Sequence, residues 1–131
     1  MPPELGSPQD WLRYARSDLR LAERPPEPEV LLEMLCFHAQ QAVEKSLKAV
    51  LGHLGVAFPR THSLRVLLDL LPTPLPCPPE VEASVALSDY AVALRYPVAY
   101  ETISVQEHAE AVRLARAALT WADAVVQGTV Q

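Results

Sequence analysis

Lysine is scarce in this sequence: Lys45 and Lys48 are the only two, and the nine other permanently cationic side chains are arginines. Asparagine is absent and proline occurs 13 times, a bias typical of thermophilic proteins or of GC-rich genomes. The only cysteines, Cys36 and Cys77, match no metal-binding spacing, so we predict a reduced, cytoplasmic protein. We expect no signal peptide, because residues 1–9 hold three prolines and no apolar stretch. We expect no membrane span, because no apolar run approaches roughly 18 residues.

The overall charge also limits the possible functions. A formal net charge of −5 argues against a protein that coats nucleic acid through its overall charge. Any contact with RNA or a nucleotide must therefore occur at a local patch of positive charge.

No phosphate-binding glycine loop, zinc-protease motif or nucleophile elbow occurs in the sequence. We predict no metal, no cofactor and no catalytic residue.

Prolines divide the chain into segments with helical periodicity. Long helices are predicted over about 7–23, 28–54, 79–96 and 104–127, with a short helix over about 63–71. No segment shows the sustained alternation of a strand. The 131 residues are therefore predicted to form one all-α domain with its core at about 7–127. Its architecture would be an up-and-down antiparallel bundle of four long helices plus one short helix.

The last helix is apolar on more than one face. One stripe contains Val112, Ala115, Leu119, Ala122 and Val126, and a second contains Leu114, Ala118, Trp121 and Val125. Either a second copy of the chain covers part of this surface or the monomer has a wide core. Of these two arrangements we predict the homodimer.

Four polar side chains share one face of the second helix: His38, Gln41, Lys45 and Lys48. At about 100° per residue, they fall within a sector of roughly 80°. An apolar stripe lies on about the opposite side: Leu32, Cys36, Ala39, Val43, Leu47, Val50 and Leu54. The polar stripe could hold an anion such as a phosphate. Alternatively, it is a solvated face on which Glu44 pairs with Lys48.

The first helix carries a second basic row: Arg13, Arg16, Arg20 and Arg24. Carboxylates at Asp10, Asp18 and Glu23 are close enough in sequence to neutralise much of this row. We therefore interpret it as a solvated charged face.

Two further positions could contact an anion. In the loop 58–63, Arg60 and His62 lie near the start of the short helix, where an anion could bind or His62 could simply fix the loop. Arg95 lies beside the helix end that Pro97 imposes. It could stabilise the helix dipole there or clamp a phosphate.

Four motifs occur in a familiar order: DWLRYARSDLRLAE, CFHAQQAVEKSLKAVL, THSLRVLL and LRYP. Over about residues 10–119, the sequence resembles the HEPN family of prokaryotic helical bundles. The resemblance implies a dimeric bundle that associates with nucleotides or RNA, frequently with a minimal nucleotidyltransferase as partner in toxin–antitoxin pairs. It also implies a polar groove, and the matching residues are His38, Gln41, Lys45, Lys48, His62, Arg95 and Tyr96.

One feature of the toxic HEPN ribonucleases is missing. They resemble one another in an arginine followed after four to six residues by a histidine, a pair suited to metal-independent cleavage. Here one residue separates Arg60 from His62, and twelve separate Arg95 from His108. We therefore predict a non-catalytic module that binds a nucleotide or RNA phosphate beside a partner nucleotidyltransferase. The alternatives are a ribonuclease in which Arg95 meets His62 or His38 in space, and a purely protein-binding, antitoxin-like scaffold.

Overall fold

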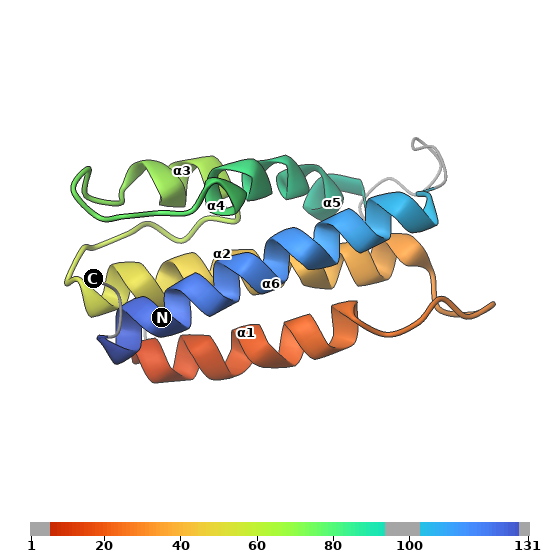
Figure 1. The fold of residues 1–131 in the computed structure, drawn as a ribbon, viewed down its shortest axis with the longest axis horizontal. Helices are drawn as coiled ribbons and strands as arrows, with labels where there is room; N and C mark the ends of the chain where they lie inside the picture. The colour runs from red at the N-terminus through yellow and green to blue at the C-terminus, as the bar shows by residue number, and fades with distance from the viewer. Residues whose placement is uncertain (1–5, 94–102, 129–131) are drawn as a thin grey trace.

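The computed structural model describes residues 6–93 and 103–128, and this part of the chain consists of helices and loops with one isolated bridge between Glu27 and Val30. Three long helices lie side by side: α1 (Pro8–Ala22), α2 (Leu32–His53) and α6 (Val105–Gln127). Shorter elements form a layer on the other side of α2 and α6 from α1 (Figure 1): α3 (Leu64–Asp69), α4 (Pro79–Ala83), the 3₁₀ helix η1 (Ser84–Leu87) and α5 (Ser88–Ala93). The predicted all-α helical bundle is confirmed.

The ends of α1 and α6 follow directly from the sequence. Ser7 and Asp10 form a capping box at the start of α1, and Ser104 and Glu107 form another at the start of α6. Each box satisfies backbone N–H groups that have no partner within the helix. Gly128, in the left-handed conformation, ends α6. Both helices therefore lie within a residue or two of their predicted bounds.

Helix α2 ends as predicted but begins later. Gly55 has φ +72°, and the N–H groups of Gly55 and Val56 donate to the carbonyls of Gly52 and Leu51, the pattern of a Schellman motif. At the other end, the helix was predicted from about residue 28 but begins at Leu32. The Glu27–Val30 bridge closes a tight turn after the prolines, which keeps this segment out of the helix.

The predicted helix over 79–96 is divided into α4, η1 and α5 where it is described. Ser84 Oγ donates to the carbonyl of Val81 at 2.6 Å, at the point where the α-helical geometry tightens into a 3₁₀ turn. Such a side-chain bond competes with the backbone ladder. The predicted end of the helix at Tyr96 lies outside the described residues.

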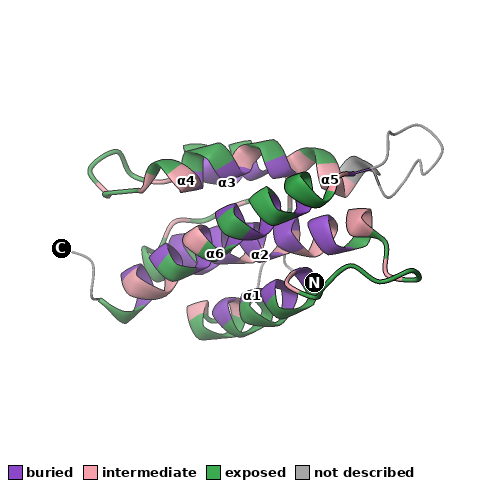
Figure 2. Ribbon diagram, turned by 45° about the vertical axis from the view of Figure 1, so that its right-hand side comes forward, coloured by how far each residue is buried: buried purple, intermediate pink, exposed green. Residues whose placement is uncertain are grey.

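Helix α2 is the central element of the bundle and packs against α1, α6 and the shorter helices. Its buried residues extend well beyond the predicted apolar stripe, as the ribbon coloured by burial shows (Figure 2). Both apolar stripes of α6 are also buried within the single chain, including Leu114, Ala118, Trp121 and Val125. The wide core of the monomer thus accounts for the surface that motivated the homodimer prediction. Within the described residues, no helix has the length and apolarity needed to cross a membrane.

Candidate functional site

The four polar residues of α2 do not form one exposed stripe. Lys48 has only 3% of its side chain exposed, whereas Lys45 has 20% and His38 has 27%. The Trp11 indole of α1 covers Lys48, whose Nζ lies 5.3 Å from the ring centroid. The solvated-face interpretation is therefore wrong at Lys48. Periodicity placed the four side chains in one sector correctly, but it could not show that α1 covers part of that sector.

One group of polar contacts joins α2 to α1 through Asp18. The two carboxylate oxygens of Asp18 contact different side chains: Oδ1 lies 2.9 Å from His38 Nδ1, and Oδ2 lies 2.5 Å from Lys45 Nζ. An ionised carboxylate only accepts hydrogen bonds, so Nδ1 of His38 carries the proton. Nε2 is then the remaining acceptor of the neutral ring. We call these three residues the Asp18 cluster.

A pocket of about 290 Å³ opens beside the Asp18 cluster. Its lining residues come from α1 and α2: Arg13, Tyr14, Ser17, Asp18 and Lys45. The guanidinium carbon of Arg13 lies 5.0 Å from the Tyr14 ring centroid, and Lys45 Nζ lies 5.9 Å from the same centroid. Two cationic residues, two residues that carry a hydroxyl and one carboxylate residue thus line one hollow. We call it the α1–α2 pocket.

A second group of contacts surrounds Glu44, which is only 2% exposed. Its carboxylate accepts hydrogen bonds from Lys48 Nζ at 3.1 Å, His62 Nδ1 at 3.0 Å and Gln40 Nε2 at 3.3 Å. Gln40 also donates to the carbonyl of His62, and Gln41 donates to Gln40. These contacts show that His62 fixes the loop 58–63, which was one of the two interpretations of this loop. We call Glu44, Lys48, His62 and Gln40 the Glu44 cluster.

Both clusters follow from the burial of charged side chains along α2. A buried carboxylate is strongly unfavourable unless cations and hydrogen-bond donors surround it. Asp18 and Glu44 each have one lysine and one histidine as partners. Within the described part of the chain, no buried side-chain nitrogen or oxygen lacks a hydrogen-bond partner. Both lysines therefore hold the fold together, and Lys45 also lines the α1–α2 pocket.

Asp18 was missed as the partner of Lys45 and His38, although the sequence carried a signal for it. Asp18 lies three residues after Ala15 and four before Ala22, in line with these two buried alanines on one face of α1. A carboxylate on an apolar face indicates a buried partner from another element. Glu44 was considered only as a surface partner of Lys48, a pairing that does occur, but in the interior.

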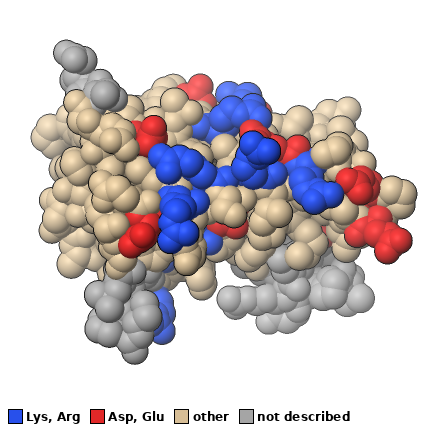
Figure 3. All heavy atoms as spheres, turned by 90° about the horizontal axis from the view of Figure 1, so that it is seen from below, with Lys and Arg blue, Asp and Glu red and all other residues tan. Residues whose placement is uncertain are grey.

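The arginine row of α1 matches its interpretation as a solvated charged face. Arg13, Arg16 and Arg24 pair with Asp10, Asp123 and Glu27, respectively, and all six side chains are well exposed. Of the three carboxylates predicted to neutralise the row, Asp10 does so, whereas Asp18 pairs with Lys45 and Glu23 with Arg116. Seen from the side of α1, Lys and Arg gather across the middle of the surface with Asp and Glu among them (Figure 3). Because the two signs of charge are mixed on this surface, an anion is attracted strongly only where several cations lie close together.

Two predicted site residues, Arg95 and Tyr96, lie outside the described residues.

Ser63 caps the short helix α3, since its Oγ accepts a hydrogen bond from the backbone N–H of Val66 at 3.2 Å. Thr61 Oγ1 in turn accepts a hydrogen bond from the backbone N–H of Ser63 at 3.0 Å.

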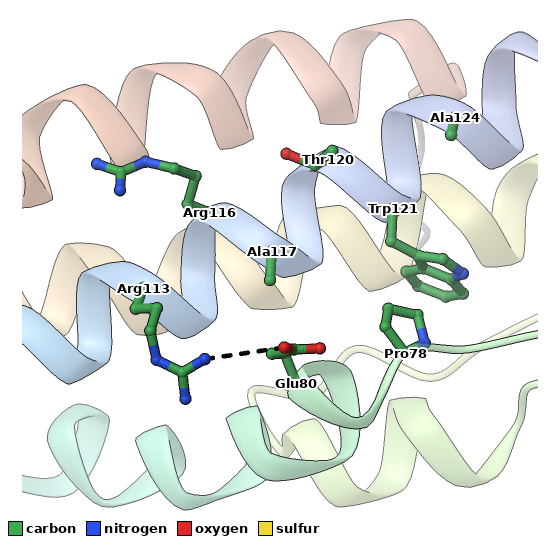
Figure 4. Close-up of a pocket in the computed structure, with 8 residues that line it drawn as sticks. All are labelled: Pro78, Glu80, Arg113, Arg116, Ala117, Thr120, Trp121 and Ala124. Atoms are coloured by element: carbon green, nitrogen blue, oxygen red, sulfur yellow. Dashed lines mark ion pairs between the residues drawn. The ribbon is translucent and has the colours of Figure 1, made fainter.

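A larger hollow of about 570 Å³ lies between α4 and α6, with a mostly apolar wall that includes Ala117, Trp121 and Pro78 (Figure 4). Arg113 spans it toward Glu80 at 3.8 Å. The Arg116 guanidinium points away toward α1, where it pairs with Glu23 at 2.6 Å. This hollow therefore presents fewer available cations to an anion than the α1–α2 pocket does.

Cys36 is a buried thiol in contact with Tyr90. Burial raises the pKa of the Cys36 thiol to about 11; the carboxylates of Glu107 and Glu33 add to the rise, and the hydrogen bond with Tyr90 opposes it. Burial likewise raises the pKa of Tyr90 to about 12, with a contribution from the neighbouring Cys36. A thiol with a raised pKa is a poor nucleophile at neutral pH. Cys36 therefore belongs to the core rather than to a reactive site.

The fold and these clusters define a class of protein, a small helical bundle whose central helix carries buried carboxylate–histidine–lysine contacts. The HEPN domain family matches residues 8–125 of the chain, and the chain belongs to this family. No curated protein matches it significantly.

Two solved structures resemble the chain along almost its whole length. One, an archaeal HEPN homologue, is 25% identical, with a TM-score of 0.70 over 93% of this chain and 99% of that one. The other, TT1696 from Thermus thermophilus, is 33% identical, with a TM-score of 0.70 over 90% of this chain and 97% of that one.

Proposed function

We propose that this HEPN domain is a non-catalytic module that binds a nucleotide or RNA phosphate in the α1–α2 pocket and acts with a partner minimal nucleotidyltransferase. The observation that carries the proposal is the joint position of Arg13 and Lys45 at one hollow, together with the Ser17 and Tyr14 hydroxyls. Guanidinium, ammonium and hydroxyl groups are the usual donors to phosphate oxygens. A homodimer remains part of this proposal.

The geometry supports a different set of proposed phosphate contacts from the set predicted from the sequence. Lys45 keeps its place because it lines the pocket and is held by Asp18. Lys48 is enclosed beneath Trp11 and paired with Glu44, so we assign it to the fold. Arg13 replaces it as the second cation. His38 keeps its role as a hydrogen-bonding neighbour through Asp18.

Isothermal titration with AMP and with a 5′-phosphorylated oligoribonucleotide tests the proposal. We expect Lys45→Gln and Arg13→Gln each to weaken binding by roughly 10- to 100-fold, because a lost charge-assisted hydrogen bond contributes roughly 1.5–3 kcal/mol. Arg20→Gln is a matched control on the same helix outside the pocket and should bind as wild type does. Equal affinities for wild type and Lys45→Gln would contradict binding in the α1–α2 pocket.

The partner can be tested separately. Co-expression with a minimal nucleotidyltransferase encoded next to the gene should give a complex that survives size-exclusion chromatography. Failure to co-purify would exclude that partner and leave phosphate binding to be judged by titration.

A metal-independent ribonuclease is a second candidate because of the contact between His62 and Glu44. Glu44 fixes the proton on Nδ1 of His62, and 63% of the His62 side chain is exposed, so Nε2 can reach a substrate. A carboxylate that orients a histidine in this way is typical of general acid–base pairs. RNA cleavage in EDTA that disappears in both His62→Gln and Arg95→Ala would favour this function. Intact RNA with the folded wild-type protein would exclude it.

A further inference from the structure

We infer that the α1–α2 pocket is selective for a terminal phosphate, a dianion, because His38 takes up a proton when the anion binds. This inference rests on the proposed function and specifies its ligand. Lys45 Nζ contacts Asp18 Oδ2 at 2.5 Å, and His38 Nδ1 contacts the other oxygen of the same carboxylate at 2.9 Å. Any anion that draws Lys45 toward itself therefore changes the surroundings of His38 through Asp18.

The charges at the pocket show why a proton is needed. With neutral His38, the cations Arg13 and Lys45 stand against the single carboxylate of Asp18, which leaves an excess of one positive charge. This excess matches an internal phosphodiester. Protonation of His38 raises it to two, which matches a phosphate monoester. Asp10 does not line the pocket but lies 3.8 Å from Arg13; both side chains are largely exposed, so solvent screens this pair and it is left out of the count.

The geometry of His38 allows this protonation without rearrangement. Nδ1–H donates to Asp18 in both the neutral and the charged ring, so only Nε2 changes. Because 27% of the His38 side chain is exposed, this nitrogen can exchange a proton with solvent. Among the described residues, the charged groups in contact with His38 are Asp18 of α1 and, through the same carboxylate, Lys45 of α2. The aromatic neighbour Phe37 packs edge-on at 5.5 Å and carries no charge.

Calorimetry counts the proton directly. Sulfate is a dianion that does not titrate near neutral pH, and its binding heat at pH 7.5 is measured in buffers of different ionisation enthalpy. We expect a clear uptake, approaching one proton for each sulfate bound by wild type. His38→Asn keeps an N–H donor toward Asp18 but cannot titrate, and it should show no uptake. Sulfate binding by wild type without proton uptake would overturn the inference even if His38→Asn failed to fold.

Competition between ligands tests the selectivity. AMP and a 5′-phosphorylated oligoribonucleotide carry a terminal phosphate, whereas the same oligonucleotide with a 5′-hydroxyl carries only diesters. We expect both phosphorylated ligands to bind at least tenfold more tightly, and the tighter of the two identifies the source of the terminal phosphate. Equal affinity for the two oligonucleotides would contradict the inference and leave the proposed function intact. Absence of binding by all three ligands and by sulfate would instead contradict the proposed function itself.

Discussion

Asp18 Oδ2 lies 2.5 Å from Lys45 Nζ and thereby joins α1 to α2 at the edge of a pocket. Lys45 therefore has a structural partner and still reaches solvent with 20% of its side chain. Lys48, three residues later, has a comparable partner in Glu44 but only 3% exposure. The two lysines of this chain thus differ in their access to solvent, although each pairs with a carboxylate.

Removal of the Glu44 charge should destabilise the bundle strongly. Glu44→Gln leaves Lys48 buried beside a neutral amide, and loss of one partner of a buried pair typically costs about 3–5 kcal/mol. Urea unfolding followed by circular dichroism measures this loss. Glu110→Gln, which removes the exposed partner of Arg113, should leave the midpoint almost unchanged. Similar midpoints for both variants would show that the Glu44 cluster contributes little to stability.

Neutralising Asp18 should have opposite effects on stability and on anion binding. Asp18→Asn deprives Lys45 and His38 of their counter-charge, so we expect a lower unfolding midpoint. It also removes the negative charge facing the pocket, so AMP should bind about tenfold more tightly, or roughly 1.4 kcal/mol. Asp123→Asn, at an exposed partner of Arg16, is the control. Weaker AMP binding by a folded Asp18→Asn protein would contradict the placement of the phosphate.

The two glycines at the end of α2 should respond oppositely to alanine. Gly55 has φ +72°, a conformation that costs an L-residue roughly 1–2 kcal/mol, so Gly55→Ala should destabilise by about 1 kcal/mol. Gly52 is helical, and a new Cβ there meets only Pro8 at 3.7 Å, an ordinary contact. Gly52→Ala should therefore stabilise by about 0.5–1 kcal/mol. Thermal unfolding of the pair provides the comparison, and an equal shift in the same direction would refute the cap assignment.

Alkaline pH should destabilise the fold in part through Cys36. Burial raises the pKa of this thiol to about 11 from its usual 9.0. The unfolded chain therefore loses the thiol proton before the folded protein does, and stability falls as the pH rises from about 9 toward 11. Cys36→Ala should show a smaller loss over this interval. Burial also raises the pKa of the Cys77 thiol, but this residue is exposed, so Cys77→Ala should reduce the loss less than Cys36→Ala does. Identical pH profiles for wild type and Cys36→Ala would exclude this contribution.

Much of the fold could be predicted from the sequence because its signals are local. Ser7, Ser104 and Gly128 mark helix ends through hydrogen bonds that span only a few residues. The division of 79–93 was not predicted, because a single side-chain bond at Ser84 interrupts an otherwise helical pattern. The monomer core also buries both stripes of α6, a result that depends on how many helices surround α6 rather than on its own periodicity.

The candidate site was predictable only in part, because its contacts join distant segments. His38 and Lys45 were placed on one face by their spacing, but their shared partner Asp18 lies 20 and 27 residues away. The same limit applies to His62, whose contact with Glu44 spans 18 residues. Spacing within a helix identifies which side chains are neighbours. It does not identify which other helix covers them.

The position of a bound phosphate tests the central claim most directly. In a ¹⁵N NMR titration with AMP, we expect the largest shifts at the amides of Arg13–Asp18 and around Lys45. The Lys45→Gln protein should show much smaller shifts at the same ligand concentration. Shifts confined to α6 around Ala117 and Trp121, or no shifts at saturating AMP, would contradict a phosphate site in the α1–α2 pocket.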